Sequence, residues 1–269
     1  MSFYTSLSGL RGAQTDLSVI SNNVANVGSV GFKRSRAQFG DIMPPSTSTA
    51  GQGTRLKGIA QQFSQGGFET SARDLDMAIS GQGFFVTRDA LSDGRTSFTR
   101  NGSMQINGER YLTDSMGGFV QGLPVDADGN PTAISLAAAT PIQLPETSAG
   151  GSRLSDVSIN DEGLVTASFA DGSTQPLAKL LIANFPNPEG LKQQGDARWA
   201  VTGESGAVVA GTAGGDGFGR IQTGALERAN VDITEELVAL IAAQRNFQAN
   251  AKAIETANTM SSAVINMRS

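Results

Sequence analysis

Residues 225–269 read ALERANVDITEELVALIAAQRNFQANAKAIETANTMSSAVINMRS, and they include neither glycine nor proline. The chain has 269 residues and 33 glycines, and its nine prolines all lie between Pro44 and Pro188. In alternating steps of four and three from Ile233 to Ile265, seven of ten positions are apolar. A segment without helix breakers and with this repeat predicts a long amphipathic helix.

The other end of the chain carries the same repeat. From Phe3 to Val24, five of seven positions in steps of four and three are apolar. This pattern predicts a helix over residues 3–27, which Gly28 and Gly31 would stop. Two glycines inside the helix each cost about 1 kcal/mol relative to alanine, so we expect it to be weak by itself.

Two apolar seams at opposite ends of one chain suggest that the ends pack on each other or on copies in neighbouring chains. The alternative is a helix buried in an ordinary globular fold. Asp232 is expected to cap the second helix, with Glu235 as its partner in a capping box. The seam residues expected to pack are Phe3, Leu7, Leu10, Leu17, Ile20, Val24, Leu237, Leu240, Ile241, Phe247, Ile254 and Ile265.

The middle of the chain has the pattern of a β-rich domain, which makes the expected fold class α+β. Short apolar or alternating runs are separated by turn signals, including Asn101-Gly102 and Asn107-Gly108, whose residue types tolerate the positive φ of hairpin turns. Residues 42–54 read as a Pro/Ser/Thr/Gly linker. The runs expected as strands are 77–79, 84–87, 97–99, 104–106, 156–159, 165–169 and 177–184.

Composition excludes several classes of function. The net charge of −5 argues against nucleic acid, because phosphate binding needs a basic face. No apolar stretch approaches the roughly 18–20 residues that span a bilayer, so no membrane-spanning helix is expected. A cleaved secretory signal is not expected either. Cysteine and histidine are both absent, which removes the commonest general base and the commonest metal ligand.

No motif for catalysis, metal or cofactor binding stands out. Residues 126–130, DADGN, resemble the start of a calcium loop, but position twelve is Ala137 where a glutamate is required, so we expect a turn. The glycines at 214–219 match neither a dinucleotide-binding nor a phosphate-binding loop. We therefore expect no catalytic, cofactor-binding or metal-binding residue, no cofactor, and no enzymatic activity.

Several motifs resemble those of the bacterial flagellar rod and hook axial proteins. They cover the beginning, the middle and the end of the chain. They are SNNVAN at 21–26, GFK at 31–33, LDMAISGQGFF at 75–85, TRNGS at 99–103, GALE at 224–227, NVD at 230–232, ELV at 236–238 and AQRNF at 243–247.

Within this family two interpretations compete. FGDIM at 39–43 with a short linker, and later ANF at 183–185, look most like the hook protein. However, hook proteins typically insert an outer β domain near residues 146–151, and here Pro145 passes almost directly to the next strand. On the FGDIM and ANF motifs the chain resembles the hook protein, in a short form that lacks the outer β domain. The distal rod subunit is the alternative.

The resemblance implies a structural subunit that polymerises into a helical tube. Its expected domains are a coiled-coil-like inner domain of residues 1–30 and 228–269, an extended linker of 31–73, and a β-rich domain of 74–227. The seam residues would form the inner wall of the tube.

The expected partners are further copies of the chain, other axial proteins (distal rod, hook cap and hook–filament junction) and the flagellar export apparatus. The expected place is the hook and basal body of the flagellum, outside the cell after export without a cleaved signal. Two other classes stay open: a secreted effector or adhesin with coiled-coil ends, and a peptidoglycan-acting enzyme.

Overall fold

The computed structural model describes residues 2–42, 53–91, 94–148 and 150–266. Helices occupy the two ends of the described chain, α1 over Ser2–Ala25 and α2 over Ile233–Asn266, with a β-rich region between them. The α+β class is therefore confirmed, and both helices lie within two residues of their expected bounds. None of the helices in these residues is long and apolar enough to cross a membrane.

The chain divides into two compact units. Unit 1 consists of Met1–Val27, Arg34–Gln62 and Val231–Ser269, and unit 2 of Gly28–Lys33 and Phe63–Asn230. Each unit is therefore built from segments far apart in the sequence.

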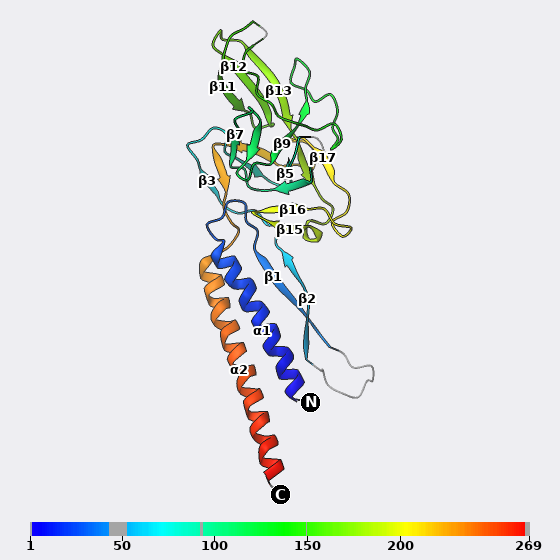
Figure 1. The fold of residues 1–269 in the computed structure, drawn as a ribbon, viewed down its shortest axis with the longest axis vertical. Coiled ribbons are helices and arrows are strands. Elements are labelled where there is room, and N and C mark those ends of the chain that lie inside the picture. Colours follow the sequence, from blue (N-terminus) through cyan, green and yellow to red (C-terminus); the bar gives the residue numbers. More distant parts are fainter. Residues whose placement is uncertain (1, 43–52, 92–93, 149, 267–269) are drawn as a thin grey trace. The chain divides into compact units, whose positions relative to one another are not determined.

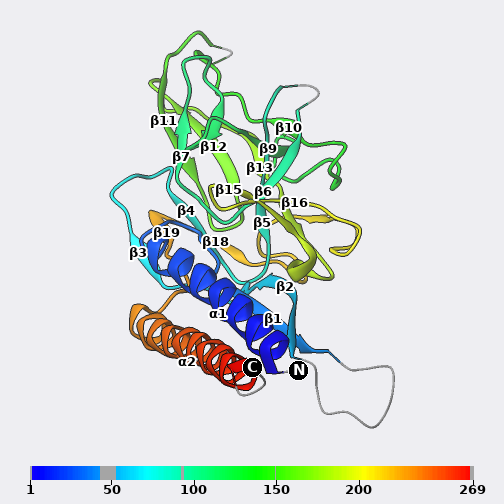
Figure 2. The same ribbon diagram turned by 60° about the horizontal axis from the view of Figure 1, so that its bottom comes forward.

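Unit 1 contains the two helices and a β-hairpin. Strands β1 (Ser35–Asp41) and β2 (Thr54–Gln61) pair antiparallel, with a bulge between Gln38 and Phe39. The helices lie side by side and antiparallel, and α1 also contacts both strands (Figures 1 and 2). A Cβ on Gly9 would lie 2.6 Å from Oδ1 of Asn250, so the two helices approach closely there.

The segment 31–73, expected as an extended linker, contains this hairpin and the short strand β3 (Phe68–Thr70). Apolar and polar residues alternate only weakly in the hairpin, and this is why it was not predicted from the sequence. The expected Pro/Ser/Thr/Gly linker falls largely on residues 43–52, which lie outside the described residues.

Unit 2 is a β structure. Besides β3, its strands are β4 (Met77–Ser80), β5 (Phe84–Arg88), β6 (Thr96–Thr99), β7 (Met104–Ile106), β8 (Leu112–Asp114), β9 (Phe119–Pro124), β10 (Thr140–Pro141), β11 (Leu154–Ile159), β12 (Leu164–Phe169), β13 (Thr174–Leu180), β14 (Ile182–Asn184), β15 (Lys192–Gly195), β16 (Arg198–Ala200), β17 (Val209–Gly211), β18 (Arg220–Thr223) and β19 (Ala225–Glu227). A short 3-10 turn, η1, spans Pro188–Gly190.

Thirteen of the strands in the described residues form one branched sheet. Its longest path is β11-β12-β13-β9-β5-β6-β16-β15. Outside this sheet, β4 pairs with β18 and β3 pairs with β19.

Two apolar cores lie within unit 2. The first is aliphatic, and the second is aromatic around Trp199, the single tryptophan of the chain. Phe63 and Phe84 meet the Trp199 ring edge-on, with ring centroids 5.4 and 5.7 Å away. Such edge-to-face packing is favoured by the ring quadrupoles, so unit 2 has a well-packed interior of its own.

The strand predictions are largely confirmed, but two of the turns are not as expected. Gly163 and Gly172 have positive φ in the turns before β12 and β13. Gly102, by contrast, does not turn a hairpin: β6 pairs with β5 and β16, and a Cβ on Gly102 would lie 1.5 Å from the Met77 carbonyl oxygen. In the turn at residues 107–110 the positive φ falls on Arg110, not on Gly108.

Candidate functional site: the helix pair and the buried ion clusters

The predicted seam on α1 lies partly inside unit 1. Ile20 is buried, and Phe3 is exposed at the start of the helix. The other seam residues of α1 are half-buried: Leu7, Leu10, Leu17 and Val24. Val19 and Asn23 are buried as well, so the face that unit 1 covers includes a polar residue outside the predicted seam.

On α2 the predicted seam is divided between two faces. Leu240, Phe247 and Ile254 are half-buried. Leu237 and Ile241 are exposed, and Ile265 lies in α2 outside the residues whose side chains are described. Among the side chains of this helix that the structure describes, the buried ones are Glu236 and Ala243. Glutamate is almost never buried without a partner, and Ala243 lies outside the steps of four and three counted from Ile233, so the sequence did not assign either residue to the packed face.

Four exposed apolar residues near the start of α2 form a strip. Its members are Ile233, Leu237, Val238 and Ile241, whose exposed fractions are 48%, 44%, 63% and 51%. They lie within a little over two turns of the helix and on adjacent positions of its surface. We call these four residues the α2 strip. An exposed contiguous apolar surface of this kind is typical of a site for protein contacts.

A buried polar cluster connects three segments of unit 1. The side-chain amide of Asn23, on α1, donates to Oε2 of Glu236 on α2 at 3.1 Å. The same amide donates to the Ser35 carbonyl oxygen at 2.9 Å, and the Ser35 N–H donates to Asn23 Oδ1 at 2.9 Å. Arg34 Nε lies 2.6 Å from Glu236 Oε1, an ion-pair contact without hydrogen-bond geometry. We call these four residues the unit 1 cluster.

The first turn of α2 completes this arrangement. Asp232 Oδ1 accepts hydrogen bonds from the N–H groups of Thr234 and Glu235, at 2.7 and 3.2 Å, which confirms the predicted N-cap. The Glu235 carboxylate accepts from Arg34 Nη1 at 3.0 Å, so its partner is a cation rather than the cap. The hydrogen bonds from the Glu235 and Thr234 N–H groups lower the pKa of Asp232 below its usual value.

A second buried cluster lies in unit 2. Lys33 Nζ is 2.7 Å from Glu227 Oε1, and Arg100 Nη1 is 3.3 Å from Glu227 Oε2. The Lys33 and Glu227 side chains are fully buried, and Arg100 is almost so. Burial lowers the pKa of both Lys33 and Arg100, and the Glu227 carboxylate opposes this effect. We call these three residues the unit 2 cluster.

Backbone groups satisfy most of the remaining polar atoms of the unit 2 cluster. Lys33 Nζ also donates to the Ser64 carbonyl oxygen at 2.8 Å, and the Gly66 N–H donates to Glu227 Oε1 at 3.0 Å. Arg100 Nη2 donates to the Gly81 carbonyl oxygen at 2.9 Å, and the guanidinium lies 5.2 Å from the centroid of a phenylalanine ring, that of Phe84. Charges in this setting are tolerated because they are paired and hydrogen-bonded.

The unit 2 cluster brings together four of the sequence motifs. Lys33 ends GFK, Arg100 belongs to TRNGS and Glu227 ends GALE, while the carbonyl groups and ring that hold Arg100 come from LDMAISGQGFF. Gly31 of GFK lies so close to this site that a Cβ there would meet the Arg100–Asn101 peptide at 2.5–2.6 Å. These motifs therefore encode one buried junction rather than an exposed surface.

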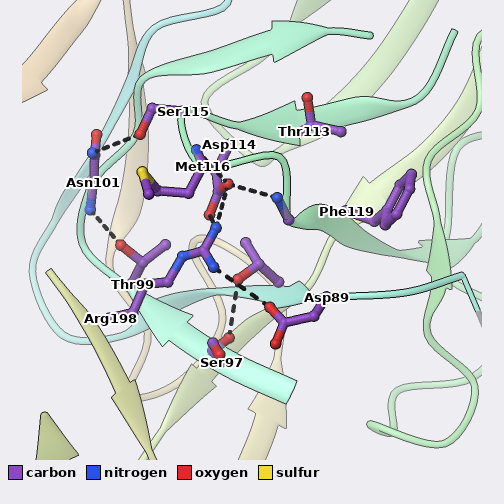
Figure 3. A network of polar contacts seen from close by, with 12 residues as sticks. Asp89, Ser97, Thr99, Asn101, Thr113, Asp114, Ser115, Met116, Phe119 and Arg198 are labelled. Atoms are coloured by element: carbon purple, nitrogen blue, oxygen red, sulfur yellow. Dashed lines mark hydrogen bonds and ion pairs between the residues drawn. The ribbon is translucent and has the colours of Figure 1, made fainter. Parts of the chain in front are cut away.

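A third polar network joins β16 to the turn between β8 and β9. Figure 3 shows Arg198 reaching Asp114, whose two oxygens both lie 2.6 Å from Nη2, and Asp89 at 3.4 Å. Asp114 Oδ1 also accepts from the N–H groups of Met116 and Gly118, at 3.0 and 2.8 Å. The three charged side chains of this network are all paired, since Arg198 contacts both Asp114 and Asp89. We therefore interpret the network as a contact that stabilises the fold, not as a reactive site.

The described residues contain no group of three or more His, Cys, Asp or Glu that could hold a metal ion.

A groove of about 480 Å³ lies within unit 1 between α1 and the hairpin. Its lining includes apolar Leu7 and Leu56, with Arg11 as its charged member on the helix.

Three family models match the chain. That described as "Flagella basal body rod protein" matches residues 3–33, "Flagellar hook protein FlgE/F/G D1 domain" matches 78–167, and "Flagellar basal body rod FlgEFG protein C-terminal" matches 222–267. The flagellar basal-body rod protein FlgG of Borreliella burgdorferi is 33% identical over 96% of this chain and 94% of its own length. The chain belongs to the flagellar hook and rod protein family.

Other members of the hook and rod family are also similar to this chain over nearly its whole length. The FlgG rod protein of Bacillus subtilis is 32% identical over 99% of this chain and 98% of its own length. The flagellar hook protein FlgE of Salmonella typhimurium is 27% identical, with both chains fully covered. That alignment extends over 409 positions, which exceeds the 269 residues of this chain, so this hook protein carries additional sequence.

Proposed function

We propose that the chain is a structural subunit that polymerises into the helical tube of the bacterial flagellum, in the hook or in the adjoining distal rod. The single observation that carries this proposal is the relation to axial flagellar proteins over nearly the whole chain. The α2 strip supports it, because it leaves an apolar surface free for a neighbouring subunit. The motifs that resemble the hook protein favour the hook.

A specific observation favours the distal rod as the second candidate. The alignments with the rod proteins of Borreliella burgdorferi and Bacillus subtilis extend over 275 and 290 positions, close to the 269 residues here. A hook bends while it rotates, and a rod does not. Electron microscopy of purified assemblies distinguishes the two: curved tubes support the hook, and straight tubes support the rod.

In the proposed tube the two helices pair in the manner of a coiled coil and form the inner wall. The half-buried seam residues pack within the pair, and the α2 strip packs on a neighbouring copy. Leu237 and Ile241 of the predicted seam then serve contacts between copies, while Leu240 and Phe247 serve contacts within one chain. This division follows their exposure in unit 1.

The decisive experiment compares two aspartate variants of α2. Ile241→Asp places a charge in the α2 strip and is expected to abolish tube formation, because a charge cannot be buried there without a partner. Ala253→Asp is the matched control, since Ala253 is exposed and lies about three turns beyond Ile241, outside the α2 strip. Sedimentation and negative-stain microscopy measure the tubes, and Trp199 fluorescence verifies that unit 2 remains folded.

Normal tubes from Ile241→Asp would overturn the role of the α2 strip. A chain that stays monomeric under all conditions, or forms small oligomers only, would favour the effector or adhesin class instead. The remaining proposals follow from the family: assembly with other axial proteins of the rod, hook cap and hook–filament junction, and export through the flagellar channel.

A further inference from the structure

The apolar contacts of the helix pair allow more than one register. Both helices carry apolar residues at steps of four and three, so a slip of seven residues would again place apolar positions opposite each other. The seam side chains are moreover only half-buried. Apolar packing alone therefore discriminates weakly between the observed register and a shifted one.

Two contacts define the observed register of the antiparallel pair. Gly9 of α1 lies against Asn250 of α2, and Asn23 of α1 lies against Glu236 of α2. The two contact points are 14 positions apart on each helix, which is two heptads. The first contact is a close approach of small or neutral groups, and the second is polar and buried.

The polar contact tolerates no slip. Asn23 and Glu236 are about 1% exposed, and the amide and carboxylate that they present to each other are each other's hydrogen-bond partners. After a shift of one turn, Asn23 would be level with an apolar position such as Leu240, and both polar groups would stay buried without this partner. An unsatisfied buried polar group is strongly unfavourable, so shifted registers are penalised.

The unit 1 cluster also fixes the register relative to the hairpin. Asn23 makes two hydrogen bonds to the backbone of Ser35, the first residue of β1, and Arg34 contacts Glu236. The end of α1, the start of β1 and the first turn of α2 are therefore held at one point. A polar residue at a single buried position is the best-attested device for selecting one register.

We infer that Asn23 and Glu236, with Arg34 and Ser35, select the register in which the two terminal helices pair. The apolar seam supplies attraction in several registers, and the unit 1 cluster makes one of them the favoured state. This assigns a positioning role to Asn23 of SNNVAN and to Glu236 of ELV that does not depend on contacts between copies.

Disulfide trapping measures the register, since the chain contains no cysteine of its own. Gly9→Cys with Asn250→Cys reports the observed register. Gly9→Cys with Ala243→Cys, or with Ala257→Cys, reports a slip of seven residues in either direction. Oxidation of dilute chain and of sedimented assemblies, followed by non-reducing electrophoresis, separates disulfides within one chain from disulfides between chains.

In the parent chain we expect the 9–250 disulfide to dominate within one chain. In the Asn23→Leu/Glu236→Leu background the ratio of this disulfide to the shifted ones should fall by about tenfold, as expected for loss of one charged buried hydrogen bond. Glu236→Gln retains an acceptor for Asn23 and should keep the ratio within about threefold of the parent value.

The matched control is Asn22→Leu/Glu255→Leu, which makes the same substitutions at exposed positions outside the unit 1 cluster and should leave the ratio unchanged. An unchanged ratio in Asn23→Leu/Glu236→Leu, or an equal fall in the control, would overturn the inference. So would disulfides that form only between chains, or an absent 9–250 disulfide in both the dilute and the sedimented samples.

Discussion

At the scale of single residues, the unit 2 cluster holds two cations and one anion in the interior of unit 2. Glu227 is the shared partner of Lys33 and Arg100, and the three side chains are almost fully buried. Removing the carboxylate leaves two buried positive charges without a counter-charge. Removing all three charges together leaves no unpaired charge in the interior. The stability of unit 2 should therefore depend on the balance of these charges.

Glu227→Gln is expected to destabilise unit 2 by about 3–5 kcal/mol, because it leaves buried cations without their anion. Urea unfolding followed by Trp199 fluorescence measures this change, since the only tryptophan lies in the aromatic core of unit 2. Glu69→Gln is the control: Glu69 pairs with Arg228 at 3.8 Å on the surface of the neighbouring strand and should contribute under about 1 kcal/mol. Equal effects of the two variants would contradict the prediction.

The N-cap of α2 gives a prediction for pH. The pKa of Asp232 is lower in the folded chain than in the unfolded chain because it accepts hydrogen bonds from the Glu235 and Thr234 N–H groups. Its stabilisation is therefore complete above the unfolded pKa of about 3.9 and is lost as the pH falls through the lower folded pKa.

Asp232→Asn keeps a capping acceptor without the titration, so the helix signal in circular dichroism should depend less on pH below about 4 than in the parent. A parent and variant with the same acid dependence would show that Asp232 does not contribute to it.

The motifs were visible in the sequence, but their joint role was not. GFK, TRNGS and GALE could be assigned to a family, yet nothing in their spacing shows that Lys33, Arg100 and Glu227 meet at one point. Such contacts depend on the sheet topology, which brings β19 next to β3 and leaves 31–33 beside them. Glu236 likewise lies in the first turn of α2, where any carboxylate complements the helix dipole, and its burial comes from packing that propensity does not encode.

At the scale of elements, the helices illustrate the same limit. The apolar repeat predicted both helices nearly to their ends, supported in α2 by the absence of glycine and proline. The repeat did not show which apolar residues face inward, because the buried side chains of α2, among those that the structure describes, are Glu236 and Ala243. The strands were predicted where alternation is regular, whereas the β1–β2 hairpin, with its bulge and exposed apolar residues, has no such alternation.

Helix formation of the two ends is expected to depend on assembly. Isolated helices are costly to nucleate, α1 contains two glycines, and much of the apolar surface of α2 stays exposed. Circular dichroism of dilute chain should therefore show less helix than α1 and α2 contain, with an increase on polymerisation. A full helix signal in the dilute monomer would contradict this expectation.

At the scale of the whole molecule, the chain consists of two units with different means of stabilisation. Unit 2 has two apolar cores of its own, while unit 1 relies on a helix pair with half-buried seams and on the unit 1 cluster. The division into a helical inner domain, a linker and a β domain stays a prediction, and the position of residues 34–62 with the helices in unit 1 suggests a different boundary.

Thermal unfolding is therefore expected to occur in two steps. The helix signal at 222 nm in circular dichroism should be lost before the Trp199 fluorescence changes, because unit 1 buries less apolar surface. Glu227→Gln should lower only the second transition, and Asn23→Leu/Glu236→Leu should affect only the first. Coincident transitions in the parent chain would mean that the two units unfold as one.

Lys33 and Arg34 are neighbours in the chain, and each is anchored in a different cluster. The chain passes between the units four times, after Val27, Lys33, Gln62 and Asn230, and at the second passage one peptide bond joins a residue of the unit 2 cluster to a residue of the unit 1 cluster. One inserted residue after Lys33 would have to form a bulge or detach a cation from its carboxylate. Length variation at this bond is therefore expected to disturb one of the two clusters, whereas surface loops tolerate it, so the bond is a fixed reference point for aligning, grafting or circularly permuting such subunits.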